Sequence, residues 1–503
     1  MLLILSVTFI ILLKRVCMRT TVEKFGLIGS GVLVGVLISL NFSALAEKVA
    51  SPQLPIDDLR MFAEVFSKVK SDYVEPVEDK KLINEALTGM LAGLDPHSTF
   101  MDADAFKDLQ AGTQGEFGGL GIEVAMEDGL VKVVTPIEDS PAFKAGLKSG
   151  DLITKLDDTQ VRGLALNDAV KKMRGKPDTP IVLTVLRKNE PKPLTFTLMR
   201  AIIKTQSVKN KYIEPGYGYV RITQFQEHTG EDLAKALKSL HDQNKGAFKG
   251  LVLDLRNNPG GLLDAAVGVS AAFLPKDDLV VYTEGRVADS KMHLTATPSD
   301  YARRGHGDYL KDLPADYKKT PIVVLINEGS ASASEIVAGA LQDHKRATIL
   351  GIQSFGKGSV QTILPINNGS AIKLTTARYF TPNGRSIQAK GIVPDINVED
   401  GFDHSNSIHE ADLGKHLSNP KDADANKTPE IRDAAKIEAV NKANEKKFAE
   451  QKGPIEPATK DDFQFVQAMN QLKGLPVMKT PEPKVADKAT DVKQDIKTDE
   501  LKK

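Results

Sequence analysis

"NEGSASASEIVAGAL", residues 327–341, contains three serines, each separated from the next by one alanine. It follows the apolar run PIVVLIN, which is typical of a buried strand, and it leads into residues with the spacing of an amphipathic helix. A buried strand that turns directly into a helix is the repeating unit of an α/β sheet. The sequence therefore predicts an α/β core with serine hydroxyls at the end of one strand, on Ser330, Ser332 and Ser334.

Two interpretations of these serines are open from the local sequence. The first N–H groups of a helix have no partner within the helix, and the helix dipole favours negative charge there. A serine at this position would have donors for an oxyanion in its own backbone, as a nucleophile requires. Ser332 and Glu335 also have the spacing of a capping box, in which the serine only closes the end of the helix.

A serine nucleophile needs a base that takes its proton, and two side chains compete for this role. His344 lies on the same predicted helix, about 18 Å along the axis from Ser332, so we expect an exposed residue at the helix end. Lys357 lies between two glycines in SFGKGSVQ, where burial would lower the lysine pKa and make the amine a general base. Because Gly358 follows Lys357, the run does not fit the phosphate-binding pattern G-x-x-x-x-G-K-[ST].

Around this stretch the chain divides into regions of different pattern. A helical region at 47–110 ends at LDPHSTFM, and a compact module at 111–200 alternates short β-like runs with glycine turns. Apolar strands alternate with helices at 201–400, which predicts a largely parallel central sheet. Residues 401–503 are polar, with one helix at 461–475 and a solvated, disordered tail. We expect a multidomain protein that combines α+β and α/β parts.

The bulk composition and the N-terminus narrow the class of protein. Lysine and arginine balance aspartate and glutamate, so no strong positive field favours nucleic acid. Cys17 is the single cysteine, which excludes a disulfide framework, and no histidine spacing predicts a metal site. Residues 1–46 have the basic start, apolar run and small-residue end of an export signal, with Met18 as an alternative start. We expect an extracytoplasmic, periplasmic protein whose N-terminus is either cleaved after Ala46 or kept as a membrane anchor.

Three long motifs resemble the carboxyl-terminal processing peptidases, the tail-specific serine proteases of family S41. They are the stretch NEGSASASEIVAGALQDHKRATILGIQSFGKGSVQ, the turn LDLRNNPGGLL and the run TTARYFTPNGRSIQAKGIVPDI. The resemblance covers about residues 55–400 and implies a protease core of ClpP/crotonase-like type. It implies that Ser332 is the nucleophile, Lys357 the base and Gln361 the residue that orients the lysine. The spacing of Lys357 and Gln361 would place both on one face of a helix or let them meet across a tight turn.

The resemblance also implies the groups that would stabilise the oxyanion. One donor would come from the glycine turn, Gly260 or Gly261, and the other from the residue after the nucleophile, Ala333. Glycines allow backbone N–H groups to approach a substrate closely, although the same turn could be structural only. No cofactor and no metal are needed for this chemistry.

By the same resemblance the module at 111–200 is a PDZ domain. Its run FGGLGIEV is similar to a loop whose backbone N–H groups capture a C-terminal carboxylate, with Gly119, Leu120, Gly121 and Ile122 as the binding residues. Arg174 is a candidate for coupling the PDZ domain to the active site, or else an exposed residue at a helix end.

We therefore expect a serine endopeptidase that recognises proteins by their free C-terminal tails. The alternative is a catalytically silent PDZ scaffold, against which the intact Ser332, Lys357 and Gln361 argue. A Ser–His esterase would require G-x-S-x-G, which the chain lacks. The predicted partners are protein substrates and a second copy of the chain, bound through residues 55–95. An adaptor lipoprotein, as some relatives use, is also compatible with the resemblance.

Overall fold

The computed structural model describes residues 54–137, 139–244, 246–303, 305, 307–400, 404, 407–421 and 455–478. The predicted export segment and the predicted C-terminal tail lie outside these residues. None of the helices within the described ranges is long and apolar enough to cross a membrane. The chain divides into two units, Met1–Leu82 and Ile83–Lys503, which we describe separately.

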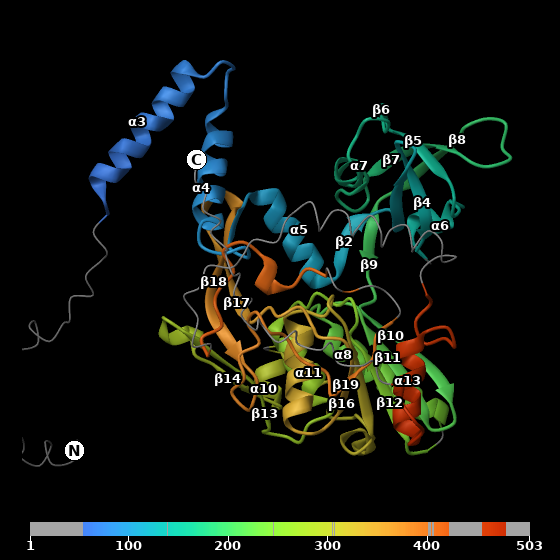
Figure 1. The fold of residues 1–503 in the computed structure, drawn as a ribbon. Coiled ribbons are helices and arrows are strands. Elements are labelled where there is room, and N and C mark those ends of the chain that lie inside the picture. Colours follow the sequence, from blue (N-terminus) through green and yellow to red (C-terminus); the bar gives the residue numbers. More distant parts are fainter. Residues whose placement is uncertain are drawn as a thin grey trace, which may run out of the picture. The chain divides into compact units, whose positions relative to one another are not determined.

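The first unit contains α3 (Ile56–Asp72) and the start of α4 (Asp79–Ala92), as the helical pattern of the sequence predicted. Both helices are drawn in blue in Figure 1. Helix α3 buries none of its residues. Phe62 and Val65, for example, are 48% and 58% exposed. A helix with its apolar side chains in water gains no stability from packing, so this surface is available to a partner.

The second unit contains a β-rich module with its own apolar core. Its sheet has the order β3–β4–β5–β7–β8, with β6 beside β5 and a separate ladder between β2 and β9. The strands are β2 (Glu116–Gly119), β3 (Ile122–Glu127), β4 (Leu130–Pro136), β5 (Leu152–Leu156), β6 (Thr159–Gln160), β7 (Pro180–Leu186), β8 (Leu194–Met199) and β9 (Ala201–Lys204), and the helices are α6 (Pro141–Lys144) and α7 (Leu166–Met173). Strand β3 ends the sheet, so one of its edges is unpaired among the described strands.

The central sheet of the same unit has the order β10–β11–β12–β15–β16–β19. All of its neighbouring strands run parallel except β10 and β11, as the alternation of strands and helices predicted. The strands are β10 (Val208–Glu214), β11 (Tyr217–Ile222), β12 (Gly250–Asp254), β15 (Ile322–Ile326), β16 (Thr348–Gly351) and β19 (Ile396–Asn397). Strands β12 and β15 are buried at every position, which is why their sequences are continuous apolar runs.

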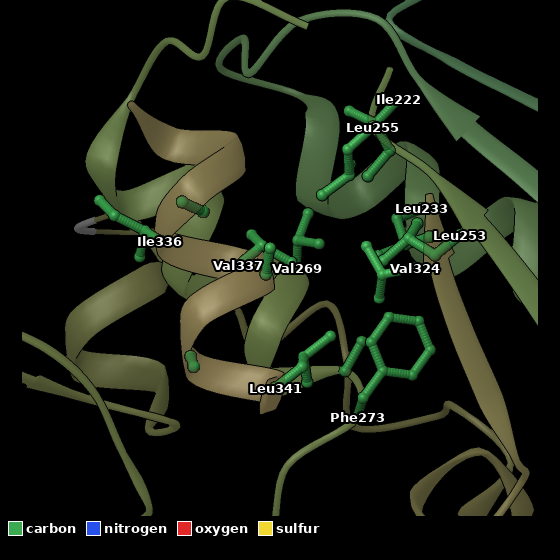
Figure 2. Packing of buried hydrophobic residues seen from close by; sticks show 14 of the residues in the cluster. Ile222, Leu233, Leu253, Leu255, Val269, Phe273, Val324, Ile336, Val337 and Leu341 are labelled. Atoms are coloured by element: carbon green, nitrogen blue, oxygen red, sulfur yellow. The ribbon is translucent and has the colours of Figure 1, made fainter. Parts of the chain in front are cut away.

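Helices cover both faces of this sheet, because successive side chains of a strand point to opposite sides. Leu253 and Val324 pack with α8 (Thr229–Asn244), α9 (Leu263–Ala271) and α11 (Ala333–Asp343), as Figure 2 shows in part. Val252 and Val323 pack on the other face against α13 (Phe463–Lys473), which is the helix predicted at 461–475. The apolar face of α13 is thus buried within the chain.

A second sheet joins segments that are far apart in the sequence. Strand β18 pairs with β1, β13 and β17, and β13 also pairs with β14. The strands are β1 (Thr99–Met101), β13 (Leu279–Gly285), β14 (His293–Thr295), β17 (Ser359–Pro365) and β18 (Ala371–Phe380). The remaining elements are α5 (Ala103–Gln114), α10 (Pro298–Tyr301) and 3-10 turns at Ala288–Ser290, Ala315–Lys318, Asn367–Gly369 and Glu410–Asp412.

Candidate active site

The site is built where the carboxyl ends of β12 and β15 meet. These strands are parallel neighbours, so the turns that follow them emerge at the same edge of the sheet. The two turns are held together by hydrogen bonds from Ala331 N to Asn258 O at 3.0 Å and from Asn257 N to Asn327 Oδ1 at 2.8 Å. The glycine turn and the serine-rich turn therefore form one rigid unit.

The three serines of this turn have different environments. Ser330 and Ser334 are fully buried, and their hydroxyls donate to Leu255 O and Asn258 O, both at 2.8 Å. Ser332 is half-buried and lines a cavity of about 780 Å³. Two of the serines thus tie the turn together, and Ser332 is the one that a substrate can reach.

The backbone at Ser332 is strained. Its φ of 55° and ψ of −112° lie in a region that residues with a side chain seldom adopt. Such strain costs about 1–3 kcal/mol and persists only where the surroundings enforce it. Ser332 is also the N-cap of α11, and its N–H donates to Glu335 Oε2 at 2.7 Å. The two interpretations of Ser332 are therefore compatible, because the same turn ends the helix and exposes the side chain.

The proposed oxyanion donors lie around Ser332, but they are not equivalent. The N–H of Gly260 donates to Asn258 Oδ1 at 2.9 Å and is thus occupied. The N–H groups of Gly261 and Ala333 donate to no acceptor within the described part of the chain. Gly260 is needed for another reason: a Cβ there would lie 2.8 Å from the Ser332 Cβ. This geometry favours Gly261 and Ala333 as the donating pair.

Lys357 lines the same cavity and is half-buried. Burial, and then the nearby charge of Lys373, lower the pKa of Lys357 to about 8. Its Nζ donates to Gln361 Oε1 at 2.5 Å and to Ser359 O at 3.0 Å. A neutral amine has two N–H bonds and one lone pair, so these two acceptors leave the lone pair for a third group.

Gln361 reaches Lys357 by a route that the sequence did not predict. The two residues lie neither on a helix nor across a tight turn: Lys357 precedes β17, and Gln361 is part of it. Alternate residues of an extended chain point to one side. A β-bulge between Val360 and Gln361 then shifts the register, so that Gln361 pairs with Thr375.

Glu335 has a larger role than the capping box predicted for it. The side chain is fully buried, and burial raises its pKa to about 7 against the opposing hydrogen bonds. One carboxylate oxygen accepts from Ser332 N and Lys357 N, at 2.7 and 3.0 Å. The other accepts from Ser354 Oγ and Gly356 N, at 2.6 and 2.7 Å. One buried carboxyl therefore joins the nucleophile turn to the loop that carries the base.

The surroundings bring Ser332 and Lys357 together without a direct bond. The Tyr379 hydroxyl donates to Lys357 O and also contacts the Ser332 side chain. No hydrogen bond joins Ser332 Oγ to Lys357 Nζ in the described structure. The other candidate base, His344, ends α11 away from the cavity. It is half-buried rather than exposed, because its Nε2 contacts Leu279 O at 2.7 Å.

The rest of the cavity is largely apolar. Side chains from the glycine turn, the start of α9, β14 and the residue before it, α11 and β17 line it: Leu262, Leu263, Met292, Leu294, Ile336 and Val360. An apolar residue next to the cleaved bond would fit such a wall. No cluster of histidine, cysteine, aspartate and glutamate within the described ranges has the geometry to hold a metal ion.

The β-rich module offers the surface expected for a C-terminal tail. The N–H groups of Leu120 and Gly121 donate to no described residue, although the Leu120 side chain is buried in the module's core. Gly119 pairs with Ala201, and Ile122 begins the free-edged strand β3. Half-buried apolar side chains of β3 and α7 pack against the module's core: Ile122, Val124, Leu166 and Val170.

Arg174 follows α7 and is more than an exposed helix end. Its guanidinium lies 4.8 Å from the Phe117 ring centroid and 3.5 Å from Asp108 Oδ1 on α5. Leu109 and Thr113 of the same helix line the active-site cavity. Arg174 thus contacts the helix that borders the site, without reaching the cavity itself.

Comparisons with known proteins agree with this organisation. Residues 216–398 match peptidase family S41, residues 118–198 a PDZ domain, and residues 39–105 the activating protease CtpB N-terminal domain. A carboxy-terminal-processing protease of Bartonella bacilliformis is 47% identical over 78% of this chain and 88% of its own. Carboxy-terminal processing protease CtpB of Bacillus subtilis is 36% identical over 74% of this chain and 75% of its own.

Among solved structures, a photosystem II D1 C-terminal processing protease is 32% identical, with a TM-score of 0.38, over 67% of this chain and 86% of its own. The extent and identity of the match to the Bartonella bacilliformis relative are decisive. The chain belongs to peptidase family S41 and is a carboxy-terminal processing serine protease with a PDZ domain and a CtpB-like N-terminal domain.

Proposed function

We propose that the protein is an extracytoplasmic endopeptidase that cleaves tailed proteins through a Ser332–Lys357 dyad, with Gln361 orienting the lysine. The observation that carries this proposal is the hydrogen bonding of Lys357 Nζ. Its two acceptors, Gln361 Oε1 and Ser359 O, occupy both N–H bonds of a neutral amine. The lone pair is then left for the Ser332 hydroxyl, which lines the same cavity.

In the first step, Lys357 Nζ takes the Ser332 proton while Oγ bonds to the carbonyl carbon of the scissile peptide. The carbonyl π electrons move to oxygen, and the N–H groups of Gly261 and Ala333 stabilise that oxyanion. Collapse breaks the C–N bond, and the Lys357 ammonium returns its proton to the leaving amine. Water then attacks the acyl-enzyme by the same route and restores the Ser332 hydroxyl.

The PDZ domain selects substrates by their C-termini. The unpaired edge of β3 would accept an extended tail as an added strand, and the N–H groups of Leu120 and Gly121 would bind its carboxylate. The half-buried apolar side chains of β3 and α7 favour an apolar last residue. Arg174, through Asp108 on α5, would report tail binding to the helix that borders the cavity.

The N-terminal region supports two further parts of the proposal. The apolar side chains of α3 are exposed, and a second copy of the chain, bound through residues 55–95, would bury them. The pattern of residues 1–46 is that of an export signal or an anchor, which supports a periplasmic or other extracytoplasmic location.

The test uses the chain from residue 47 and a loosely folded protein with a free apolar C-terminus, in EDTA, with fragments identified by mass spectrometry. Wild-type protein should cleave it, and Ser332→Ala and Lys357→Ala should not. Lys357→Arg should also fail, because arginine does not lose its proton near neutral pH. Ser239→Ala is the control, because this exposed serine on α8 lies outside the cavity. Turnover by Lys357→Ala at the wild-type rate would exclude the dyad.

A further inference from the structure

Asp95 lies in LDPHSTFM, a segment outside the three catalytic motifs, yet it connects to the active site. The residue is 4% exposed and follows α4. Its carboxylate accepts from Ser98 Oγ at 2.7 Å and from the N–H groups of His97 and Ser98 at 2.9 and 3.0 Å. It also accepts from Thr375 Oγ1 on β18, at 3.0 Å. Burial opposes the charge, but these hydrogen bonds prevail and hold the pKa of Asp95 below its ordinary value.

A charged carboxylate gives the neighbouring hydrogen bonds one direction. Asp95 can only accept, so the Thr375 hydroxyl must point its proton at Asp95. The lone pairs of Thr375 Oγ1 then accept from Gln361 Nε2, at 3.2 Å. The second N–H of that amide donates to Ser359 Oγ at 3.0 Å. Because both N–H bonds of the Gln361 amide donate to these two oxygens, its carbonyl oxygen must face Lys357 Nζ.

We propose that Asp95 is a positioning residue for the general base: its charge acts through Thr375 and makes Gln361 present an acceptor to Lys357. The inference rests on the proposed dyad of Ser332 and Lys357. With the Gln361 amide reversed, an NH₂ group would face the lysine N–H bonds. Lys357 would then lose one of its two acceptors, and its lone pair would no longer be held for Ser332.

The fold explains how a residue so distant in sequence reaches the site. Strand β1, the last part of this segment, pairs with β18, with Thr99 opposite Lys373. This pairing fixes Asp95 beside Thr375. Because the match to the CtpB-like N-terminal domain ends at residue 105, the segment belongs to that domain rather than to the protease core. The N-terminal domain therefore supplies part of the hydrogen-bond network that orients the base.

Asp95 also acts on Lys357 through its charge. The charged groups around the Lys357 amine are Lys373 on β18, Glu410, Glu335 on α11 and Asp95 itself. Lys373 lowers the pKa of Lys357, and the three carboxylates raise it. Neutralising Asp95 should therefore move the acidic limb of the pH–rate profile to lower pH, although the plateau rate falls. A residue that only supported the fold would not produce these opposite changes.

The experiment measures kcat, KM and the pH–rate profile of the chain from residue 47 with a tailed peptide. Thr375→Val removes the hydroxyl without changing the shape of the strand residue, and kcat should fall about 10- to 100-fold with KM little changed. Thr375→Ser should restore most of the rate. Thr376→Val is the matched control, since that hydroxyl bonds only to Thr362 among the described residues.

Asp95→Asn should lower the plateau and shift the acidic limb downward in pH. Asp102→Asn, which alters a carboxylate that only caps α5, should do neither. The double variant of Asp95→Asn and Thr375→Val should lose no more rate than one substitution alone, because both interrupt one network. If Asp95→Asn does not fold, the Thr375 variants decide the question.

A folded Thr375→Val enzyme with wild-type kcat would overturn the inference, and so would losses that multiply in the double variant. These outcomes are separable from failure of the dyad. If Lys357→Ala still cleaves, the proposed function is wrong. If Lys357→Ala is inactive while Thr375→Val is fully active, only the role of Asp95 is wrong.

Discussion

Cleavage by this protein should depend on pH through the protonation of Lys357. The lysine must be neutral to take the Ser332 proton, and its pKa is lowered to about 8, first by burial and then by Lys373. The active form is therefore the deprotonated one, so the rate should rise with pH and level off above 8. An ordinary lysine, with a pKa of about 10.4, would give a rise displaced by more than two pH units.

The size of the change follows from the titration of one group. With a pKa of about 8 the neutral fraction is roughly 1% at pH 6, about 9% at pH 7 and about 91% at pH 9. The value of kcat/KM should therefore rise about 90-fold between pH 6 and pH 9. Glu335, whose pKa is raised to about 7 chiefly by burial, gains a proton in the same range and should make the fall below pH 7 steeper.

The assay measures kcat/KM for a tailed peptide from pH 6 to pH 10 at constant ionic strength. Circular dichroism at each pH confirms that the enzyme stays folded. Lys373→Met removes the positive charge that helps lower the Lys357 pKa, so its acidic limb should move to higher pH. A flat profile between pH 6 and pH 9, or a downward shift in Lys373→Met, would refute the assignment of Lys357 as the base.

Three further predictions concern the supports of the site. Glu335→Gln puts an amide NH₂ against backbone N–H donors and leaves buried groups without hydrogen-bond partners. The free energy of unfolding in urea should therefore fall by about 2–5 kcal/mol, and kcat/KM should fall more than 100-fold. Glu335→Asp is the charged control, and wild-type activity in Glu335→Gln would contradict the bridging role. Arg256→Met leaves the fully buried Asp254 without its main ion-pair partner, so the free energy of unfolding should fall by about 3–5 kcal/mol. Arg60→Met, which alters an exposed ion pair, is the control and should leave the stability unchanged. Gly121→Ala places a Cβ 2.2 Å from Ser140 Cβ at a φ of +73°, so it should weaken binding of an apolar C-terminal peptide in fluorescence anisotropy. The chain should still react with a serine-directed active-site probe, and unchanged peptide affinity would exclude this loop as the carboxylate site.

The α/β core could be predicted because its signals are local. Strands β12 and β15 are buried on both faces and therefore read as unbroken apolar runs. The helices after them, α9 and α11, are rich in small and apolar residues because most of their residues are buried. The choice of Ser332 came from the resemblance to family S41, since the local sequence left a helix cap and a nucleophile both open. In the structure the hydroxyls of Ser330 and Ser334 tie down the turn.

The orientation of the base could not be predicted in the same way. Spacing suggested that Lys357 and Gln361 share a helix face or a turn, whereas they lie along an extended segment with a bulge. The bulge arises from the pairing of β17 with β18, which is a tertiary contact. Glu335 was recognised only as a helix cap, because three of its four hydrogen-bond donors, on Ser354, Gly356 and Lys357, come from a later loop of the chain.

The contacts of the C-terminal helix could not be predicted from the sequence either, because they are tertiary contacts. Helix α13 follows a long polar stretch and looks unpartnered, yet Phe465 and Met469 complete the second core of the sheet. The guanidinium of Arg256, in the motif that forms the glycine turn, bonds to both Asp254 and Asp462. Asp462 is the N-cap of α13, so the helix is anchored to the residues that lead into the glycine turn. Removing the chain after residue 454 would uncover an apolar sheet face and deprive Arg256 of a buried carboxylate. The polar region at 401–503 thus contains a segment that supports the residues leading into the glycine turn.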